Sequence, residues 1–222
     1  MNRRFLLLSS AALGGLMLAS CAESRKEMRA DDRALVNQAV ATVGVMKRHG
    51  GAKIAALLQK AKAVVIFPDI LKGGVVLGGS RGQGVMLVHG PQGWSYPAFY
   101  ETTSVSLGVQ LGFEESSVVM IVMKQRALDS LLQTSNFTLK VGGGLTFADF
   151  NKATQAELEG ADVVIWSKSE GAFAGLTLSG SDVSQRLDLD RSYYGKPVTA
   201  AEIAKGTVSN PQADPLRAAL SG

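Results

Sequence analysis

The periodicity of the apolar residues changes once along this chain, at Ala63, and that change limits the folds that the chain can adopt. Between residues 35 and 46 apolar residues recur at intervals of three and four, which gives a helix one apolar face. Residues 52–62 repeat this spacing and predict a second, shorter helix. From Ala63 onward β-rich runs with a period of two prevail. The pattern predicts an α+β fold, with N-terminal helices packed on a twisted, mostly antiparallel β-sheet system.

The segments after Ala63 fit separate strands and short helices. Val64–Phe67 is a strand-like run stopped by a proline, and Val118–Met123 is continuously apolar, as in a strand covered on both faces. Residues 74–79 and 84–89 predict two strands joined by a tight turn at Ser80–Gln83. The other expected elements are strands at 103–112, 137–141, 163–167 and 173–178, a helix at 124–133, a short Ala-rich helix after Gly195 and a loose tail at 211–222.

Glycine is unusually frequent, at 25 of 222 residues, and it follows no collagen-like period. Such a composition favours a β protein with many turns and with strands that approach each other closely. We therefore expect Gly78, Gly79, Gly82 and Gly84 to have structural roles, in turns and in close strand contacts.

The first twenty residues have the pattern of an export signal. Arg3 and Arg4 precede an apolar stretch too short for a permanent membrane-spanning helix, and Leu18-Ala19-Ser20 leads to Cys21, the only cysteine. Bacterial lipoprotein precursors are lipidated on a cysteine in this position and cut before it. An ordinary signal peptide is the alternative, and the export route, Sec or twin-arginine, stays open. The expected division is a signal peptide at 1–20, a lipidated N-terminus bearing acyl chains such as palmitate with a tether at 21–33, a domain at 34–210 and the tail at 211–222.

Positive charge is concentrated in the first half of the mature chain. Without residues 1–20 the chain holds 21 basic and 19 acidic residues, yet residues 33–100 hold eight basic side chains against Asp69 alone, a net charge of +7. This uneven distribution of charge suits a surface that faces anionic lipid head groups. The alternative is a solvated basic face without a specific role. The candidate head-group ligands are Lys47, Arg48, Lys53, Lys60, Lys62, Lys72 and Arg81.

No set of residues in the sequence amounts to a catalytic or metal site. The run Gly78-Gly79-Ser80-Arg81-Gly82 matches the nucleophile elbow of α/β-hydrolases, which needs a helix after the serine and an acid between serine and histidine. Residues 83–89 are instead strand-like, and no Asp or Glu lies between Ser80 and His89, the last histidine. The phosphate-loop-like run from Gly73 lacks its lysine, and one cysteine with two histidines cannot form a Cys/His zinc centre. We expect no enzyme activity, no cofactor and no metal.

Two other groups of residues have structural interpretations. The carboxylate pairs Glu114-Glu115 and Asp188 with Asp190 lack a calcium-loop spacing and are expected to be solvated. Trp94, Tyr96, Phe99 and Tyr100 surround Pro97 and predict a buried corner beside the sheet, the alternative being a membrane interface.

Nine stretches fall in the order of one known family. They are Ala61–Pro68, Gly78–Gly84, Gly93–Ala98, Gly108–Gly112, the apolar run Val118–Met123, Ala127-Leu128, Ser167–Gly175, Leu178–Gly180 and Tyr193–Gly195. They resemble the SYLF lipid-binding domain family, whose yeast members are known as actin-binding proteins. The resemblance covers about residues 35–195 and implies a non-enzymatic domain without a cofactor that binds membrane lipids, phosphoinositides in eukaryotic members, with some members also bundling actin. Asp190 stands where that family usually has Asn.

The export signal and the resemblance together predict a membrane-anchored lipoprotein whose SYLF-like domain binds phospholipid, with anionic head groups expected. Because Ala22 rather than Asp follows Cys21, we expect it in the outer membrane, facing the periplasm, if the host is Gram-negative. Actin is not expected as a partner of an exported protein, and neither is a nucleic acid. The alternative is an envelope structural or interaction protein that binds a protein partner through its basic face; an esterase acting through Ser80 is a distant third.

Overall fold

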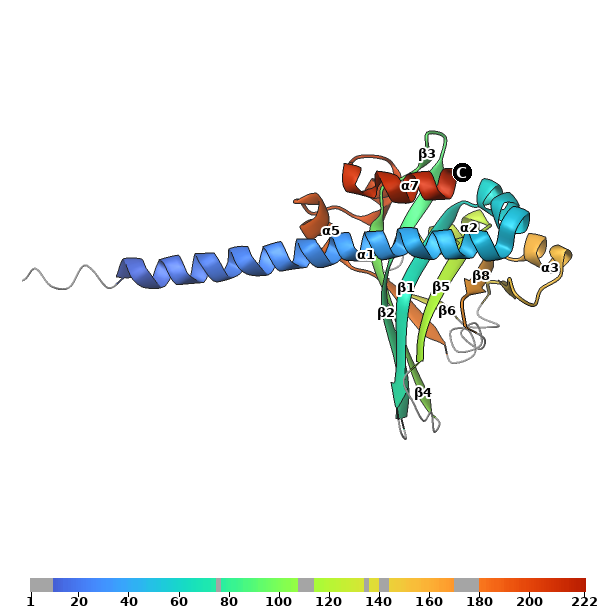
Figure 1. Cartoon of the computed structure of the whole chain (residues 1–222), viewed down its shortest axis with the longest axis horizontal. Coiled ribbons are helices and arrows are strands. Elements are labelled where there is room, and N and C mark those ends of the chain that lie inside the picture. Colours follow the sequence, from blue (N-terminus) through green and yellow to red (C-terminus); the bar gives the residue numbers. More distant parts are fainter. Residues whose placement is uncertain (1–9, 75–76, 108–113, 134–135, 140–143, 170–179) are drawn as a thin grey trace, which may run out of the picture.

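The computed structural model describes residues 10–74, 77–107, 114–133, 136–139, 144–169 and 180–222 (Figure 1). Within these residues nine strands form one sheet in the order β6-β9-β4-β2-β1-β5-β8-β7, with the short β3 paired to β2. Paired strands are antiparallel except β7 and β8, which are parallel. The strands are β1 (Ala63–Gly74), β2 (Leu77–Gly90), β3 (Gly93–Trp94), β4 (Ala98–Leu107), β5 (Glu114–Val122), β6 (Asn136–Leu139), β7 (Phe147–Asp149), β8 (Val163–Ser167) and β9 (Ser181–Gln185). The predicted fold class is confirmed.

The longest helix, α1 (Ser10–Lys60), crosses one face of the sheet and extends beyond it toward the N-terminus (Figure 1). Gly51 interrupts the helix with φ 50° and ψ −135°, a conformation that glycine adopts at little cost. Both predicted helical segments are therefore present and meet at a kink. The first one does not start after residues 21–33, the expected tether, but continues N-terminally through them. None of the helices in the described ranges is long and apolar enough to span a membrane.

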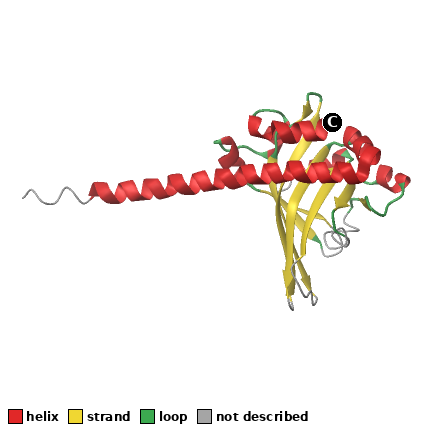
Figure 2. Ribbon diagram, in the orientation of Figure 1, coloured by secondary structure: helices red, strands yellow, loops and turns green. Residues whose placement is uncertain are grey.

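Helices cover both faces of the sheet (Figure 2). One layer contains α1, α3 (Gln155–Gly160), α5 (Leu187–Tyr194) and α7 (Asp214–Ser221), and the other contains α2 (Gln125–Gln133) and α6 (Ala200–Ala204). Alternate residues of β1 serve the two layers, with Val64 and Ile66 packed beneath α1 and Val65 and Phe67 packed toward α2 and α6. Residues 118–122 of β5 are completely buried, which confirms the prediction of a strand covered on both faces.

The predicted turn at Ser80–Gln83 is wrong, because these residues lie inside β2, where Arg81 pairs with Leu71 and Gly82 with Ile70. The two expected short strands are one long strand. Strand β1 likewise continues past Pro68, and its register against β2 shifts between Ile66 and Asp69. Proline has no N–H to donate, so it is accommodated at such an irregularity.

The glycines of β2 permit this irregularity. A Cβ atom on Gly82 would lie 2.8 Å from the carbonyl oxygen of Asp69, and one on Gly84 would lie 2.3 Å from that of Ile66. Both distances are too short for a real side chain. The expected close strand approach is therefore confirmed at these two positions, although neither glycine is in a turn.

The C-terminal residues do not form the expected loose tail. They form a 3-10 turn, η1 (Pro211–Ala213), followed by α7, whose Leu216 and Leu220 are buried in the core beneath α1. The domain therefore extends to residue 221 rather than 210. Helices α3 and α5 and strands β7 and β9 were also not expected, because each is too short to show a clear apolar period. The strand expected at 173–178 lies outside the described residues.

Candidate functional site

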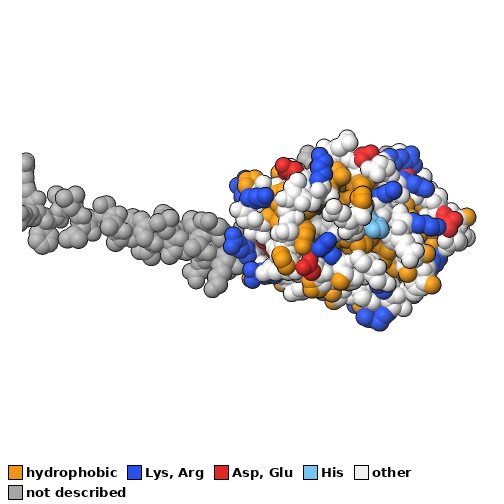
Figure 3. All heavy atoms as spheres, turned by 90° about the horizontal axis from the view of Figure 1, so that it is seen from above, with side chains coloured by type: hydrophobic (Ala, Val, Ile, Leu, Met, Phe, Trp, Pro, Cys, Tyr) orange, Lys and Arg blue, Asp and Glu red, His pale blue; other side chains and the backbone are white. Residues whose placement is uncertain are grey.

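The seven basic candidates lie in two separate groups. Lys47, Arg48, Lys53, Lys60 and Lys62 lie at the C-terminal end of α1 or just after it. Lys72 and Arg81 lie on β1 and β2, toward the end of the sheet that is far from the helices. Ten residues of extended chain separate Lys62 from Lys72, which corresponds to about 30 Å. Lys and Arg side chains are accordingly spread between acidic and apolar ones on the face seen from above (Figure 3).

Most of these cations already have protein partners. Lys47 Nζ donates to the carbonyl oxygen of Ala219, and Lys53 Nζ lies 3.5 Å from that of Ala153 and 5.0 Å from the ring centre of Phe150. Lys60 pairs with Glu159 at 3.9 Å, and Arg81 with Glu101 at 3.1 Å. Arg48 and Lys62 are exposed. The structure therefore does not bring all seven into one head-group site, and Arg48 and Lys62 are the cations most available to an external surface.

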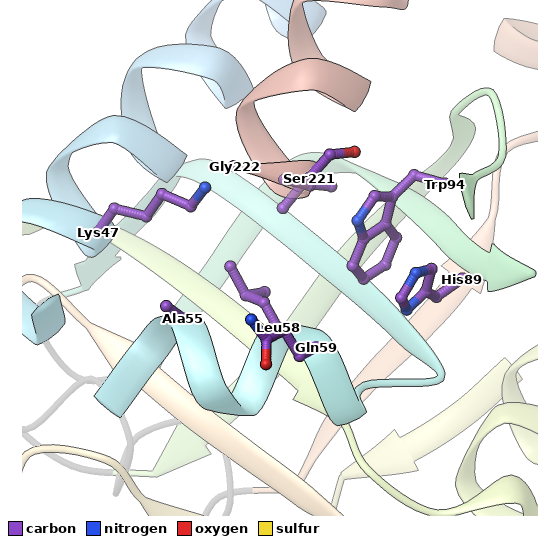
Figure 4. A pocket seen from close by; sticks show the side chains of 9 residues that line it. Lys47, Ala55, Leu58, Gln59, His89, Trp94, Ser221 and Gly222 are labelled. Atoms are coloured by element: carbon purple, nitrogen blue, oxygen red, sulfur yellow. The ribbon is translucent and has the colours of Figure 1, made fainter. Parts of the chain in front are cut away.

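A cavity of about 270 Å³ lies where the kink of α1 meets the C-terminal end of α7 (Figure 4). Lys47 enters it from one side, and Ala55, Leu58 and Gln59 form the wall beyond Gly51. His89 and Trp94 close the side formed by β2 and β3, and Leu220, Ser221 and Gly222 close the remaining side. No Asp or Glu side chain is among these lining residues.

Trp94 is held firmly at this cavity. Its ring stacks on that of His89 with centroids 4.5 Å apart and planes 10° from parallel. His89 is itself fixed, with Nδ1 3.2 Å from the carbonyl oxygen of Ala61. The main-chain carbonyl of Trp94 accepts a hydrogen bond of 2.8 Å from Nε of Arg217 in α7. The prediction of a buried corner holds, since Trp94, Phe99 and Tyr100 are buried.

A second group of polar residues is buried between α1, α5 and β4. Asp190 accepts hydrogen bonds from the Phe99 amide at 2.9 Å and from Nε2 of Gln185 at 2.7 Å. Burial raises the pKa of Asp190 to about 7 and that of Asp32, on α1, to about 6. The expectation that Asp190 is solvated is therefore wrong. Of Asp188 and Asp190, only Asp188 is partly exposed. The ion pair with Arg186 lowers the pKa of Asp188.

Asp32 is 158 positions from Asp190 in the chain, and only the packing of α1 on α5 brings the two acids into one region. One carboxylate oxygen of Asp32 and the hydroxyl of Tyr193 are buried without a hydrogen-bond partner in the described part of the chain. The sequence contained no spacing from which this cluster could have been identified. The carboxylates of Glu114-Glu115 lie outside what the structure describes.

The geometry around Ser80 does not support hydrolysis. Ser80 lies within β2 and its Oγ is 2.7 Å from Oγ of Ser104 on β4. His89 is nine residues further along the same strand, about 30 Å away at the rise of extended chain. No group of three His, Cys, Asp or Glu side chains in the described residues is placed to hold a metal ion.

Comparison with known proteins relates this chain to one family. Residues 103–222 match the family model Ysc84, described as "Las17-binding protein actin regulator". The chain is 32% identical over 181 residues to SH3 domain-containing YSC84-like protein 1 of Bos taurus, covering 78% of this chain and 52% of that protein. The human protein of the same name is 31% identical over 184 residues, with the same coverage. LAS seventeen-binding protein 3 of Saccharomyces cerevisiae is 33% identical over 167 residues, covering 72% of this chain and 36% of that protein.

The chain thus spans about half, or less, of the length of these relatives. Their names refer to protein partners and to SH3 domains, not to lipids. The family description mentions actin regulation, so the names give no support to the expectation that actin is excluded as a partner.

Proposed function

Because the chain belongs to the Ysc84, or SYLF, family, we propose that it is a non-enzymatic lipoprotein, anchored to the envelope membrane through Cys21, whose domain binds anionic phospholipid. One observation carries this proposal. The only cysteine follows Leu18-Ala19-Ser20, and it is continuous, through helix α1, with the folded domain.

Acyl chains supply most of the membrane affinity in this proposal. Burial of acyl groups contributes about 0.8 kcal/mol per methylene, whereas one basic residue near an anionic surface adds about 1 kcal/mol. The anchor therefore determines residence at the membrane, and the domain's cations determine orientation. Arg48 and Lys62 are the proposed contacts, because both are exposed, whereas Lys47, Lys53, Lys60 and Arg81 each have a partner within the protein.

The anchor is tested with Cys21→Ser in the natural host. A serine hydroxyl is a far weaker nucleophile than a thiolate, so this variant should carry no acyl group by mass spectrometry and should leave the membrane fraction. In a Gram-negative host the wild-type chain should fractionate with the outer membrane. Unchanged acylation of the variant would remove the lipoprotein assignment.

The lipid contact is tested with residues 22–222 and vesicles. Arg48→Glu combined with Lys62→Glu should weaken co-sedimentation with phosphatidylglycerol vesicles and leave phosphatidylcholine vesicles unaffected. Lys196→Glu is the control, because Lys196 is also exposed but lies between α5 and α6. If Lys196→Glu has the same effect, the contact is not specific to the end of α1.

A protein partner is the second candidate function, and the names of the relatives favour it. On this alternative the same exposed cations would contact an acidic protein surface in the envelope. Failure of residues 22–222 to bind any vesicle, with normal acylation of Cys21, would favour this function over lipid binding.

A further inference from the structure

We propose that the contact between Asp32 and α5 is a pH-dependent clamp, which holds the N-terminal part of α1 on the domain in acid and releases it as the pH rises toward neutral. The inference does not depend on membrane anchoring, so it can fail while the proposed function holds, and the reverse. It rests on the place where α1 leaves the domain and on the groups that are buried there (Figure 1).

Asp32 is the outermost buried residue of α1 among those whose side chains the structure describes. Residues 29–31 are exposed, whereas Asp32 is only 2% exposed. One turn further into the domain, Leu35 joins the apolar cluster that contains Leu189 and Tyr193 of α5. Figure 1 shows α1 continuing past α5 and away from the sheet on this side. The last buried contact of α1 is therefore made by a carboxyl group and not by an apolar side chain.

The nearest cation does not neutralise this carboxyl group. Arg186, which precedes α5, pairs with Glu101 at 3.1 Å and with Asp188 at 2.7 Å. No side chain that the structure describes forms an ion pair with Asp32. One carboxylate oxygen of Asp32 and the hydroxyl of Tyr193 are buried without a hydrogen-bond partner in the same part of the chain. The ionised form of Asp32 is therefore poorly stabilised while α1 is docked.

Burial accordingly raises the pKa of Asp32 to about 6, and the Ser192 hydroxyl offsets only part of this effect. The charges of Asp31 and Asp188 raise this pKa further, and that of Arg186 lowers it. When the turn is released into water, the pKa returns toward its ordinary value of 3.8. Docked α1 thus binds the proton more tightly than released α1 does. The clamp is strongest below the ordinary pKa and weakens as the pH rises through about 6.

The other charged groups around this contact are Arg29, Arg33, Asp190 and Asp214. The charge of Asp32 contributes to the raised pKa of Asp190, so ionisation of both acids places two negative charges in one buried region. Arg33 and Asp214 act on Tyr193 in opposite directions. Nε of Arg29 donates to the main-chain carbonyl oxygen of Ser192 at 3.3 Å, a bond that does not require the charge of Asp32. None of these groups reverses the direction of the pH dependence.

Release of this turn has one consequence that does rest on the proposed function. The segment between Cys21 and Asp32 would no longer be held on α5, so the angle between the membrane anchor and the domain would become free above neutral pH. In acid the same segment would be fixed.

Hydrogen exchange of the full-length chain in neutral detergent, at pH 5 and pH 7.5, tests the clamp. Mass spectrometry of peptic peptides follows residues 26–34, at the clamp, and residues 39–46, where α1 is buried on the sheet. After correction for the intrinsic exchange rate, protection of residues 26–34 should be about tenfold lower at pH 7.5. A pKa of about 6, compared with 3.8, gives this difference over that range. Protection of residues 39–46 should not change.

Variants then assign the titrating group. Asp32→Asn should give residues 26–34 the same protection at both pH values, about tenfold or more above the wild type at pH 7.5, because its amide has no charge to bury. Asp31→Asn is the matched control, since it removes the same charge from the adjacent, exposed position, and it should keep the difference. Asp190→Asn should also retain a difference, because Asp32 still titrates.

Each outcome supports or overturns the proposal. Equal protection of residues 26–34 at both pH values in the wild type overturns it, and so does an equal loss in residues 39–46, which would reflect the stability of the whole domain. A wild-type difference that persists in Asp32→Asn assigns the titration to another group and also overturns it. If Asp32→Asn does not fold, the comparison with Asp190→Asn decides, and a response that disappears in that variant overturns the clamp.

Discussion

Asp190 is a fully buried carboxylate whose charge is disfavoured by its surroundings. Its two hydrogen-bond donors, the Phe99 amide and Gln185, stabilise the ionised form but do not offset burial, so the pKa rises to about 7. A raised pKa means that the folded state binds the proton more tightly than the unfolded state does. The contribution of Asp190 to stability is therefore present at acidic pH and is lost as the pH rises toward 7.

We predict that Asp190→Asn stabilises the protein at pH 8, and that this stabilisation is smaller at pH 5 by on the order of 2 kcal/mol, because the loss extends from the ordinary pKa of an aspartate up to about 7. An asparagine Oδ1 can still accept from the Phe99 amide, and the Gln185 amide can rotate to present its oxygen. Thermal unfolding at the two pH values measures the effect. Asp188→Asn is the comparison and should have the opposite sign at pH 8, because Arg186 favours the ionised form of Asp188. Equal effects of Asp190→Asn at both pH values would contradict this assignment.

Gly84 is required for close packing of β2 on β1 rather than for backbone freedom. An added Cβ would lie 2.3 Å from the Ile66 carbonyl oxygen and 2.5 Å from Cδ1 of Phe67. Gly84→Ala should therefore lower the free energy of unfolding by about 1 to 3 kcal/mol. Gly160→Ala is the control, because nothing lies within 4 Å of the added atom, and it should be neutral or slightly stabilising. Denaturant unfolding of both variants distinguishes the two outcomes.

At the scale of elements, apolar periodicity predicted those helices and strands that contain enough residues to show a clear apolar pattern. The two helical segments of α1, strand β5 and helix α2 were all expected from runs of six to twelve residues. The composition of Ser80–Gln83 is typical of a turn, whereas its one glycine, Gly82, lies against the irregularity in β1. That irregularity lies in β1, the neighbouring strand, so residues 80–83 alone could not predict it.

The candidate site was less predictable than the fold. The charge of Lys47 makes it a candidate, but its partner Ala219 is 172 positions away in the sequence, in the segment predicted to be a loose tail. The Trp94 side of the cavity likewise depends on Arg217 of α7. A helix of eight residues with only two buried leucines has too weak a period to be recognised by itself.

Helix α7 should behave as part of the core. Leu216 is completely inaccessible and Leu220 nearly so, both packed in the cluster beneath α1. Leu216→Ala should lower the free energy of unfolding by about 2 to 4 kcal/mol, because it removes buried methyl groups and leaves a cavity. Gln212→Ala, at an exposed position of the preceding turn, should have no measurable effect. A Tm unchanged by Leu216→Ala would show that residues 211–222 are the loose tail first expected.

At the scale of the whole molecule, α1 sets the distance between Cys21, the proposed anchor, and the exposed cations at its other end. Cys21 and Arg48 are 27 residues apart in the helix, which corresponds to about 40 Å. The anchor and the end of α1 can therefore contact one membrane together only if α1 lies along its surface. In that orientation the layer of α1 faces the lipid, and the layer of α2 and α6 faces away from it.

Labels attached to introduced cysteines test this orientation, because the proposed lipidation would consume the thiol of Cys21, the only natural one. In the lipidated protein on phosphatidylglycerol vesicles, a fluorophore on Ala56→Cys, which is exposed in the α1 layer, should be quenched by a head-group quencher. A fluorophore on Gln133→Cys, exposed at the end of α2, should not. At high salt the difference should vanish while the protein stays bound, since screening removes the contribution of Arg48 and Lys62 but leaves the acyl chains inserted. Equal quenching of both labels at low salt would mean that α1 stands away from the membrane, with the domain held only by its anchor.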